Sequence, residues 1–309
     1  MIKISQLISD FLIRMLTIRF RSSQIEYYSR LIFSSILILL SFCLIYPHFG
    51  LTKAFGQSNN FFISENAYGR IQFLKAWDTM DGAYQYGLFI DLKNNWKTYW
   101  KYPGNSGFTP KFQLTGSKNL KDFLVSWPAP EVFYEGDTKI YGFKEKLYLP
   151  IKIYPENLGN ATNFEMRLDI GFCKDICIPE TVYLKSVNAP PASKIQNQEL
   201  LKYLRKVPIN LESSENYVSC TVEKDQDNLN LISKFNSEFF KGKKNIMDAI
   251  FNYRGEEIWF SNKNQRSDKG TQIFSITLNH INDQSILLNK SKIEVTILTQ
   301  ERGFTLQGC

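Results

Sequence analysis

From Phe73 onward, apolar and polar residues alternate along the chain with the period of two that is typical of β-strands. Three segments, residues 84–92, 146–154 and 163–172, alternate in this way or run apolar over the length of a strand. Turn-forming glycine and proline residues punctuate the chain at 102–107, 127–130 and 155–160. Many short strands separated by such turns predict an all-β fold, an antiparallel β-sandwich.

One later segment has the period of a helix instead. Residues 197–207 carry an apolar stripe and end before Pro208. The stripe consists of Leu200, Leu201, Leu204 and Val207. Strand-like segments resume after it, at residues 217–224, 228–235, 256–263, 271–278 and 291–298. We therefore predict a first β-sandwich at 66–190, a connecting helix in a linker at 191–208, and a second, smaller β-sandwich domain at 209–309.

The N-terminal region has a different pattern. Residues 31–46 form an uncharged, mainly apolar run of 16, which follows Arg30 and ends before Pro47. A bilayer span needs about 20 residues, whereas this length suits the core of a secretory signal. The small residues Ala54 and Gly56 stand where a signal peptidase cleaves. Residues 1–56 are therefore predicted to be a signal peptide or, alternatively, an uncleaved N-terminal membrane anchor.

Composition and charge narrow the function classes. The chain of 309 residues is 43% hydrophobic, which is enough for folded cores. Outside residues 1–56 it has 31 basic and 28 acidic residues, with no basic run interleaved with aromatics, so nothing favours nucleic acid as a partner. No other apolar run approaches membrane length. We expect an exported protein that meets the membrane only through its N-terminal segment, in an oxidising compartment where disulfides persist.

The stretch GFCKDICIPE places Cys173 and Cys177 four positions apart. Residues so spaced on a straight strand are ~13 Å apart, whereas a disulfide needs Cα atoms within about 4.4–6.8 Å. If the two cysteines pair, the chain must turn back at Lys174–Asp175. Such a bend is exposed and its disulfide is easily reduced. The loop is also too small for a staple to stabilise much.

Metal binding is a further alternative for the pair. Zinc takes four ligands, and the exported part offers only His280, Cys220 and Cys309 as further cysteine or histidine candidates. The C-x3-C-P spacing resembles that of the copper-delivering Sco proteins, in which a helix begins at the second cysteine. Here the β-branched and aromatic residues of 178–187 predict a strand. We therefore expect no metal and no cofactor, with Cu(I) handling as the least favoured alternative.

Residues 73–187 resemble the periplasmic N-terminal domain of the protein-disulfide reductase DsbD. Three pieces in order carry the resemblance: residues 94–133, residues 133–153, and the cysteine pair followed by Ile-Pro-Glu at 178–180. The resemblance implies an immunoglobulin-like β-sandwich whose cysteines cycle between dithiol and disulfide. It also implies a membrane-embedded electron donor of the DsbD or CcdA kind and periplasmic thioredoxin-like proteins as acceptors. Both partners are expected to be separate proteins.

Carried over to this chain, the resemblance makes Cys173 and Cys177 the catalytic redox pair. It makes Phe133 the aromatic cap that shields them, with Tyr134 beside it. Three residues separate the two cysteines here, whereas five separate them in the best-known members of the family. From the residues themselves, an adjacent cation lowers a thiol pKa, so Lys174 is a candidate for tuning the thiolate, with Asp175 partly opposing it.

Cys220 and Cys309 are the other two cysteines of the part of the chain expected to be exported. A bridge between them would close a loop of about 90 residues and stabilise the second domain by about 4–5 kcal/mol in the chain-entropy model; a free C-terminal thiol is the alternative. The sequence thus predicts a periplasmic thiol–disulfide interchange protein, a disulfide-reductase-type electron relay, with cytochrome c biogenesis among the pathways it could serve. The alternative is a non-catalytic adaptor with a structural Cys173–Cys177 disulfide.

Overall fold

The computed structural model describes residues 63–309 except residue 105 and residues 213–215, 226–227, 237–245, 256–257 and 281–286. The expected signal peptide or anchor at 1–56 lies outside the described residues. All the described residues belong to one structural unit. Within them, no helix is both long and apolar enough to cross a membrane.

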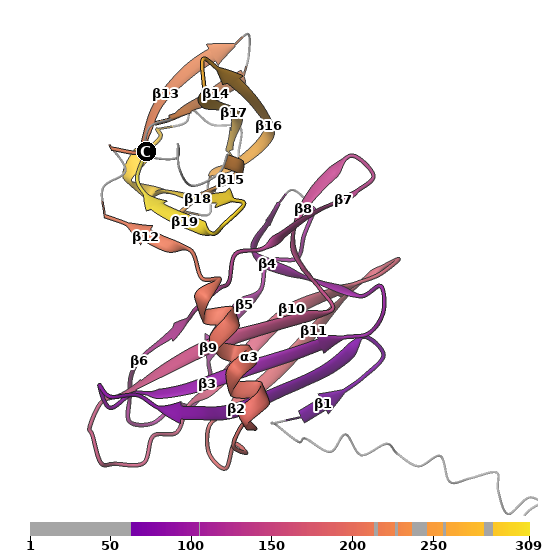
Figure 1. The fold of residues 1–309 in the computed structure, drawn as a ribbon, viewed down its shortest axis with the longest axis vertical. Helices are drawn as coiled ribbons and strands as arrows, with labels where there is room; N and C mark the ends of the chain where they lie inside the picture. Colours follow the sequence, from indigo (N-terminus) through magenta and orange to yellow (C-terminus); the bar gives the residue numbers. More distant parts are fainter. Residues whose placement is uncertain are drawn as a thin grey trace, which may run out of the picture. The chain divides into compact units, whose positions relative to one another are not determined.

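Two sheets form the first sandwich (Figure 1). The first sheet has the order β1-β2-β3-β9-β6. The second has the order β11-β10-β4-β8-β7, with β5 also paired to β10. The strands of the first sheet are β1 (Ile63–Glu65), β2 (Gly69–Asp78), β3 (Tyr84–Leu92), β6 (Leu120–Val125) and β9 (Lys146–Pro155). Those of the second are β4 (Lys97–Gly104), β5 (Lys111–Leu114), β7 (Glu131–Glu135), β8 (Thr138–Lys144), β10 (Glu165–Cys173) and β11 (Cys177–Lys185).

The strands β3 and β9 are apolar on both faces, because both faces are covered. Their inward side chains, such as Leu88 and Ile151, belong to the core between the two sheets. Their outward side chains Phe89 and Tyr148 pack beneath helix α3 (Lys194–Arg205). Both strands therefore read as apolar runs in the sequence rather than as strict alternation.

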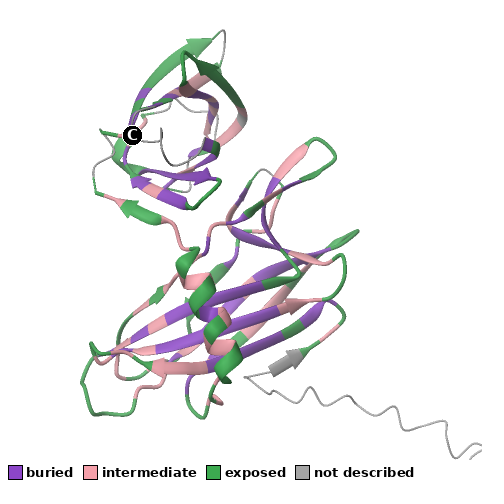
Figure 2. Cartoon of the chain, in the orientation of Figure 1, coloured by how far each residue is buried: buried purple, intermediate pink, exposed green. Residues whose placement is uncertain are grey.

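Helix α3 lies on the outer face of the first sheet (Figure 1). It begins at a capping box, in which Ser193 and Gln196 each bond the other's backbone N–H. Leu200 is buried, whereas Leu201 is exposed, so the predicted stripe is wrong at Leu201. Tyr203 takes its place, because positions three apart share a helix face and adjacent positions do not. Figure 2 shows the exposed outer side of the helix.

The second sandwich has two four-stranded sheets. Their orders are β12-β19-β18-β15 and β13-β14-β17-β16, with β12 parallel to β19. The strands are β12 (Ile209–Leu211), β13 (Val218–Asp225), β14 (Asn228–Phe235), β15 (Ile246–Tyr253), β16 (Ile258–Asp268), β17 (Thr271–His280), β18 (Ile293–Thr299) and β19 (Gly303–Gln307). Apart from the 3-10 turn Lys290–Lys292, α3 is the only helix in the described part of the chain. The predicted fold class, all-β and immunoglobulin-like with a second sandwich and one connecting helix, is confirmed.

Candidate functional site

The cysteine pair closes a hairpin between β10 and β11. Cys173 is the last residue of β10 and Cys177 is the first of β11, and the two are cross-strand partners joined by a disulfide with Cα atoms 4.1 Å apart. The predicted turn at Lys174–Asp175 is confirmed. Both of these side chains are exposed in it, and the Lys174 N–H donates to the Ile176 carbonyl at 3.2 Å.

The predicted strand after Cys177 is also confirmed, because β11 runs from Cys177 to Lys185. Pro179 fits there because β11 is the edge strand of its sheet, where a missing N–H leaves no ladder bond unmade. No helix begins at Cys177, so the thioredoxin-like architecture of the copper alternative is absent here. In the described residues, no group of three or more His, Cys, Asp or Glu side chains could hold a metal ion.

The two cysteines differ in exposure. The Cys173 residue is only 1% exposed, whereas Cys177 is exposed. Cys173 belongs to a small buried cluster with Tyr99, Phe133 and Ile140. Cys177 is therefore the more exposed residue of the pair.

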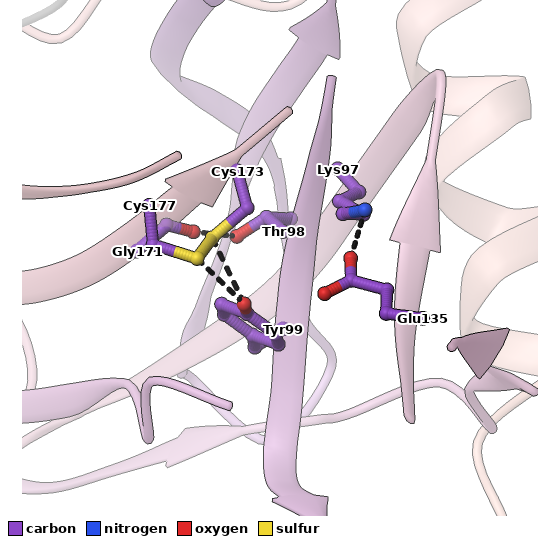
Figure 3. Close-up of a disulfide and its surroundings, with 7 residues drawn as sticks. All are labelled: Lys97, Thr98, Tyr99, Glu135, Gly171, Cys173 and Cys177. Carbon is purple, nitrogen blue, oxygen red and sulfur yellow. Dashed lines mark hydrogen bonds and ion pairs between the residues drawn. A yellow bond between two sulfur atoms is a disulfide. The ribbon is translucent and has the colours of Figure 1, made fainter. Parts of the chain in front are cut away.

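Tyr99 on β4 points its hydroxyl at both sulfurs (Figure 3). Its oxygen lies 2.9 Å from the Cys173 Sγ and 3.0 Å from the Cys177 Sγ. Disulfide sulfurs carry no hydrogen, so the hydroxyl is the donor. Burial, with a smaller effect of Glu135, raises the pKa of Tyr99, which keeps the hydroxyl protonated at neutral pH. The sequence by itself does not single out Tyr99, because its contact with the sulfurs depends on how β4 is placed beside β10.

Lys97 is a second residue that the sequence did not single out. It is the cross-strand partner of Cys173 where β10 meets β4, and directly opposed side chains lie on the same face of a sheet. Its ammonium group forms an ion pair with Glu135 and lies 5.8 Å from the centre of the Phe133 ring. The lysine opposite Cys173 is thus on a neighbouring strand, with its ammonium group directed toward Glu135 (Figure 3).

Phe133 lies in the same cluster as Cys173 and is 8% exposed. It stands on β7 opposite Ile140 of β8, and its ring crosses Gly142, where an added Cβ would lie 3.2 Å from a ring carbon. Tyr134, the next residue, is 63% exposed. Neighbours on a strand point to opposite faces, so the Phe133 side chain lies on the face of β7 that carries this cluster and the Tyr134 side chain lies on the other.

The other two cysteines lie in the second sandwich. Cys220 on β13 and Cys309 at the C-terminus are joined by a disulfide with Cα atoms 5.4 Å apart. The Ser233 hydroxyl lies 3.1 Å from the Cys220 Sγ. Cys220 belongs to the core of this sandwich, and Cys309 packs against it. This bridge is therefore part of a packed core, unlike the pair at the hairpin end.

Comparison with known proteins agrees with this geometry. Residues 70–189 match the model of the N-terminal region of the thiol:disulfide interchange protein DsbD. No curated protein matches the chain significantly. A similar solved structure is the N-terminal periplasmic domain of ScsB from Proteus mirabilis, at 15% identity and a TM-score of 0.58, over 78% of this chain and 93% of that chain.

At that identity the ScsB likeness is evidence of fold. It covers about twice the share of the chain that the family model does, so it includes much of the second sandwich. The family match itself spans β2 to β11 and takes in the cysteine hairpin, the β7–β8 hairpin and Tyr99. Residues 70–189, less than half of the chain, therefore match the N-terminal domain of the thiol:disulfide interchange protein DsbD.

Proposed function

We propose that the protein is a periplasmic thiol–disulfide relay that works through Cys173 and Cys177. The observation that carries the proposal is the environment of the pair: Cys177 is an exposed residue, Cys173 is buried in a cluster with Phe133, and a protonated hydroxyl lies near both sulfurs. A disulfide that only holds a turn needs neither a sulfur buried beside an aromatic ring nor a hydroxyl donor to its sulfurs.

Reduction of the pair takes two thiol–disulfide exchanges. A thiolate of the electron donor attacks the Cys177 Sγ, the disulfide breaks, and Cys173 leaves as a thiolate while Cys177 is held in a mixed disulfide. The Tyr99 hydroxyl, 2.9 Å from the Cys173 Sγ, stabilises the leaving thiolate by donating a hydrogen bond. The second thiol of the donor then attacks its own sulfur in the mixed disulfide and releases Cys177. The dithiol has gained two electrons and two protons.

Delivery to an acceptor runs in the opposite direction. The Cys177 thiolate attacks the acceptor's disulfide, and the Cys173 thiolate resolves the mixed disulfide, which restores the Cys173–Cys177 bond. Between the two half-reactions the dithiol must survive in an oxidising compartment. The apolar cover of Phe133 on Cys173 reduces adventitious oxidation, which follows exposure.

The assignment of compartment and partners rests on the comparisons and on the expected export signal. The similar domain of ScsB is described as periplasmic, and DsbD is named as a thiol:disulfide interchange protein. We propose a membrane-embedded donor of the DsbD or CcdA kind and periplasmic thioredoxin-like acceptors. The alternative, a binding adaptor that keeps the fold, is favoured only if the pair does not exchange.

Redox titration of the exported chain tests the proposal. The chain is equilibrated in thiol buffers of graded potential, and the state of each cysteine is read by alkylation and peptide mass. A relay pair is expected to have a midpoint between about −180 and −270 mV, whereas a structural disulfide lies below about −300 mV. The Cys220–Cys309 bridge in the same samples is the internal control. A Cys173–Cys177 pair that stays oxidised as long as this bridge does would contradict the relay.

A further inference from the structure

The β7–β8 hairpin has two faces with different neighbours. Successive residues of a strand point to opposite faces. Ile140 on β8 and its partner Phe133 on β7 lie in the cluster that covers Cys173. Lys139 and Tyr141, on either side of Ile140, contact the second sandwich instead. The hairpin that carries the cap is therefore held from behind by residues outside the family-matched domain.

The contact centres on Asp248 of β15, which is 2% exposed. Tyr141 donates its hydroxyl hydrogen to the Asp248 Oδ2 at 2.9 Å, and the Lys139 Nζ donates to the same oxygen at 3.0 Å. Lys263 of β16 forms an ion pair with Asp248 and donates to the Tyr141 hydroxyl oxygen at 2.7 Å. We call Lys139, Tyr141, Asp248 and Lys263 the latch.

Apolar packing continues the latch. Ile250, which follows Asp248 on β15 by two positions, and Leu298 of β18 belong to the same buried cluster as Tyr141. Val132 of β7 packs partly against that cluster. The back of the hairpin thus meets both a charged centre and an apolar surface, which together oppose its movement away from the second sandwich.

The Asp248 carboxylate remains charged in this setting. Burial by itself would raise its pKa, but Lys263 and Lys139 outweigh that effect and lower the pKa below its ordinary value. A buried charge that loses a partner is costly. Displacement of β8 would remove Lys139 and Tyr141 from Asp248, so the hairpin favours the position in which Phe133 covers Cys173.

We propose that the second sandwich controls the cap: Asp248 and Tyr141 are positioning residues that hold Phe133 over Cys173, and the cap opens when this latch is released. The inference rests on the proposed function, because a controlled cap matters only to a pair that exchanges. It assigns the second sandwich a role in the redox site, through a contact between residues 107 positions apart.

The test uses the full exported chain with Tyr141→Phe, which removes one hydroxyl group, and separately with Asp248→Asn. After reduction, the alkylation rate of Cys173 is measured by peptide mass. The measurement is made under conditions in which every variant remains folded, as checked by denaturant titration. Both variants should react faster by about three- to tenfold, the factor that corresponds to loss of one hydrogen bond. If Asp248→Asn does not fold, the Tyr141→Phe result decides alone. Unchanged or slower alkylation would overturn the latch.

Glu294→Gln is the matched control. Glu294 on β18 also pairs with a lysine of the first sandwich, since the Lys101 Nζ lies 2.6 Å from its carboxylate, but Lys101 is on β4 and not on the hairpin. It should leave the Cys173 rate within about twofold, because a contact away from the hairpin does not couple to it. If it accelerates alkylation as much as Tyr141→Phe does, the effect is general loosening and the latch is wrong.

Two further combinations sharpen the result. The double variant of Tyr141→Phe and Asp248→Asn should be no faster than the faster single one, because both remove the same contact. In a Phe133→Ala background the latch variants should add nothing, since the cap is already gone; an added effect there would contradict the mechanism. The alkylation rate measures how accessible Cys173 is and needs no partner protein. The latch can therefore be contradicted while the redox titration supports the relay, and the relay can be contradicted while the alkylation rates support the latch.

Discussion

At the scale of single residues, the two sulfurs of the pair have different surroundings. Cys177 is exposed at the start of β11, and Cys173 is buried beside Tyr99 and Phe133. In the proposed relay, Cys177 is the sulfur that is attacked and Cys173 is the one that leaves, and the Tyr99 hydroxyl lies near both sulfurs. This division follows from position alone, since the two residues are chemically identical.

Phe133→Ala should raise the alkylation rate of the reduced Cys173 by roughly an order of magnitude, since access and thiolate character set thiol reactivity. Phe133→Leu keeps an apolar side chain over the sulfur and should have a smaller effect. The measurement is peptide mass after timed alkylation. Equal rates in the wild type and Phe133→Ala would mean that Phe133 is only a core residue.

Tyr99→Phe removes the hydroxyl and keeps the ring. Reduction of the disulfide by a small dithiol should slow by about tenfold or more, the factor that corresponds to a hydrogen bond to a charged group. Tyr134→Phe, a neighbouring exposed tyrosine on the hairpin, is the control and should leave the rate unchanged. Stopped-flow or quenched reduction assays give the rates. A normal rate for Tyr99→Phe would exclude the hydroxyl from the leaving step.

At the scale of elements, two hairpins and one strand form the site. The β10–β11 hairpin presents the cysteines, β4 brings Lys97 and Tyr99, and the β7–β8 hairpin brings Phe133. Gly142 on β8 is where these elements are closest. Its backbone is paired with Tyr99 of β4, and the Phe133 ring packs over it.

Gly142→Ala should therefore disturb both the sheet and the cap. The added Cβ would lie 2.3 Å from the Thr98 carbonyl oxygen, a backbone atom that cannot swing aside. We expect the free energy of unfolding to fall by about 1–3 kcal/mol, the range for overpacking, as read by denaturant titration. Gly116→Ala, where the nearest atom is the flexible end of Glu165 at 3.3 Å, should change it little. Equal losses in both variants would contradict this account.

At the scale of the whole molecule, the second sandwich contributes a charge to the first and has a disulfide of its own. Asp248 reaches the cap hairpin, and Cys220–Cys309 ties the C-terminus into the second core. Each has a measurable consequence for the stability of the protein.

The latch should make stability depend on pH. Asp248 faces Lys139, Tyr141 and Lys263, and its folded pKa lies below the ordinary value of 3.8. A depressed carboxyl pKa contributes stability that is present above the ordinary pKa and is lost as pH falls through the folded one. The unfolding free energy of the wild type should therefore exceed that of Asp248→Asn at neutral pH, with a gap that shrinks below about pH 4. A gap that is constant from neutral to acid pH would contradict this assignment.

The Cys220–Cys309 bridge should stabilise the protein. Its partners are 89 positions apart, and closing a loop of that size contributes about 4–5 kcal/mol in the chain-entropy model. Replacing both cysteines by serine should lower the unfolding free energy by up to that amount and leave the alkylation of the other pair unaltered. Peptide mapping without reduction checks the pairing. A Cys309 that takes up label before reduction would show that the bridge is absent.

Much of the fold could be predicted from the sequence, because the patterns that indicate strands and turns involve residues close together in the chain. The alternation along β14 and the apolar runs of β3 and β9 are visible in short windows of the sequence, and the spacing of Cys173 and Cys177 required a turn if the two residues pair. The strand after Pro179 followed from β-branched residues in the same way. The buried face of helix α3 could not be predicted in this way. Leu200 belongs both to a stripe with Leu201 and to one with Tyr203, and only its packing on Phe89 selects the second.

The sequence by itself thus determined the β-sandwich class, the hairpin of the cysteine pair and a resemblance that singled out Phe133. Only the tertiary structure decided that the Tyr99 hydroxyl lies near the sulfurs and that Lys97 stands opposite Cys173, because the register between β4 and β10 joins residues more than 70 positions apart. It also decided that Asp248 meets Tyr141. Such contacts depend on how whole sheets pack and register, a property of all the side chains together, and no window of the sequence encodes it.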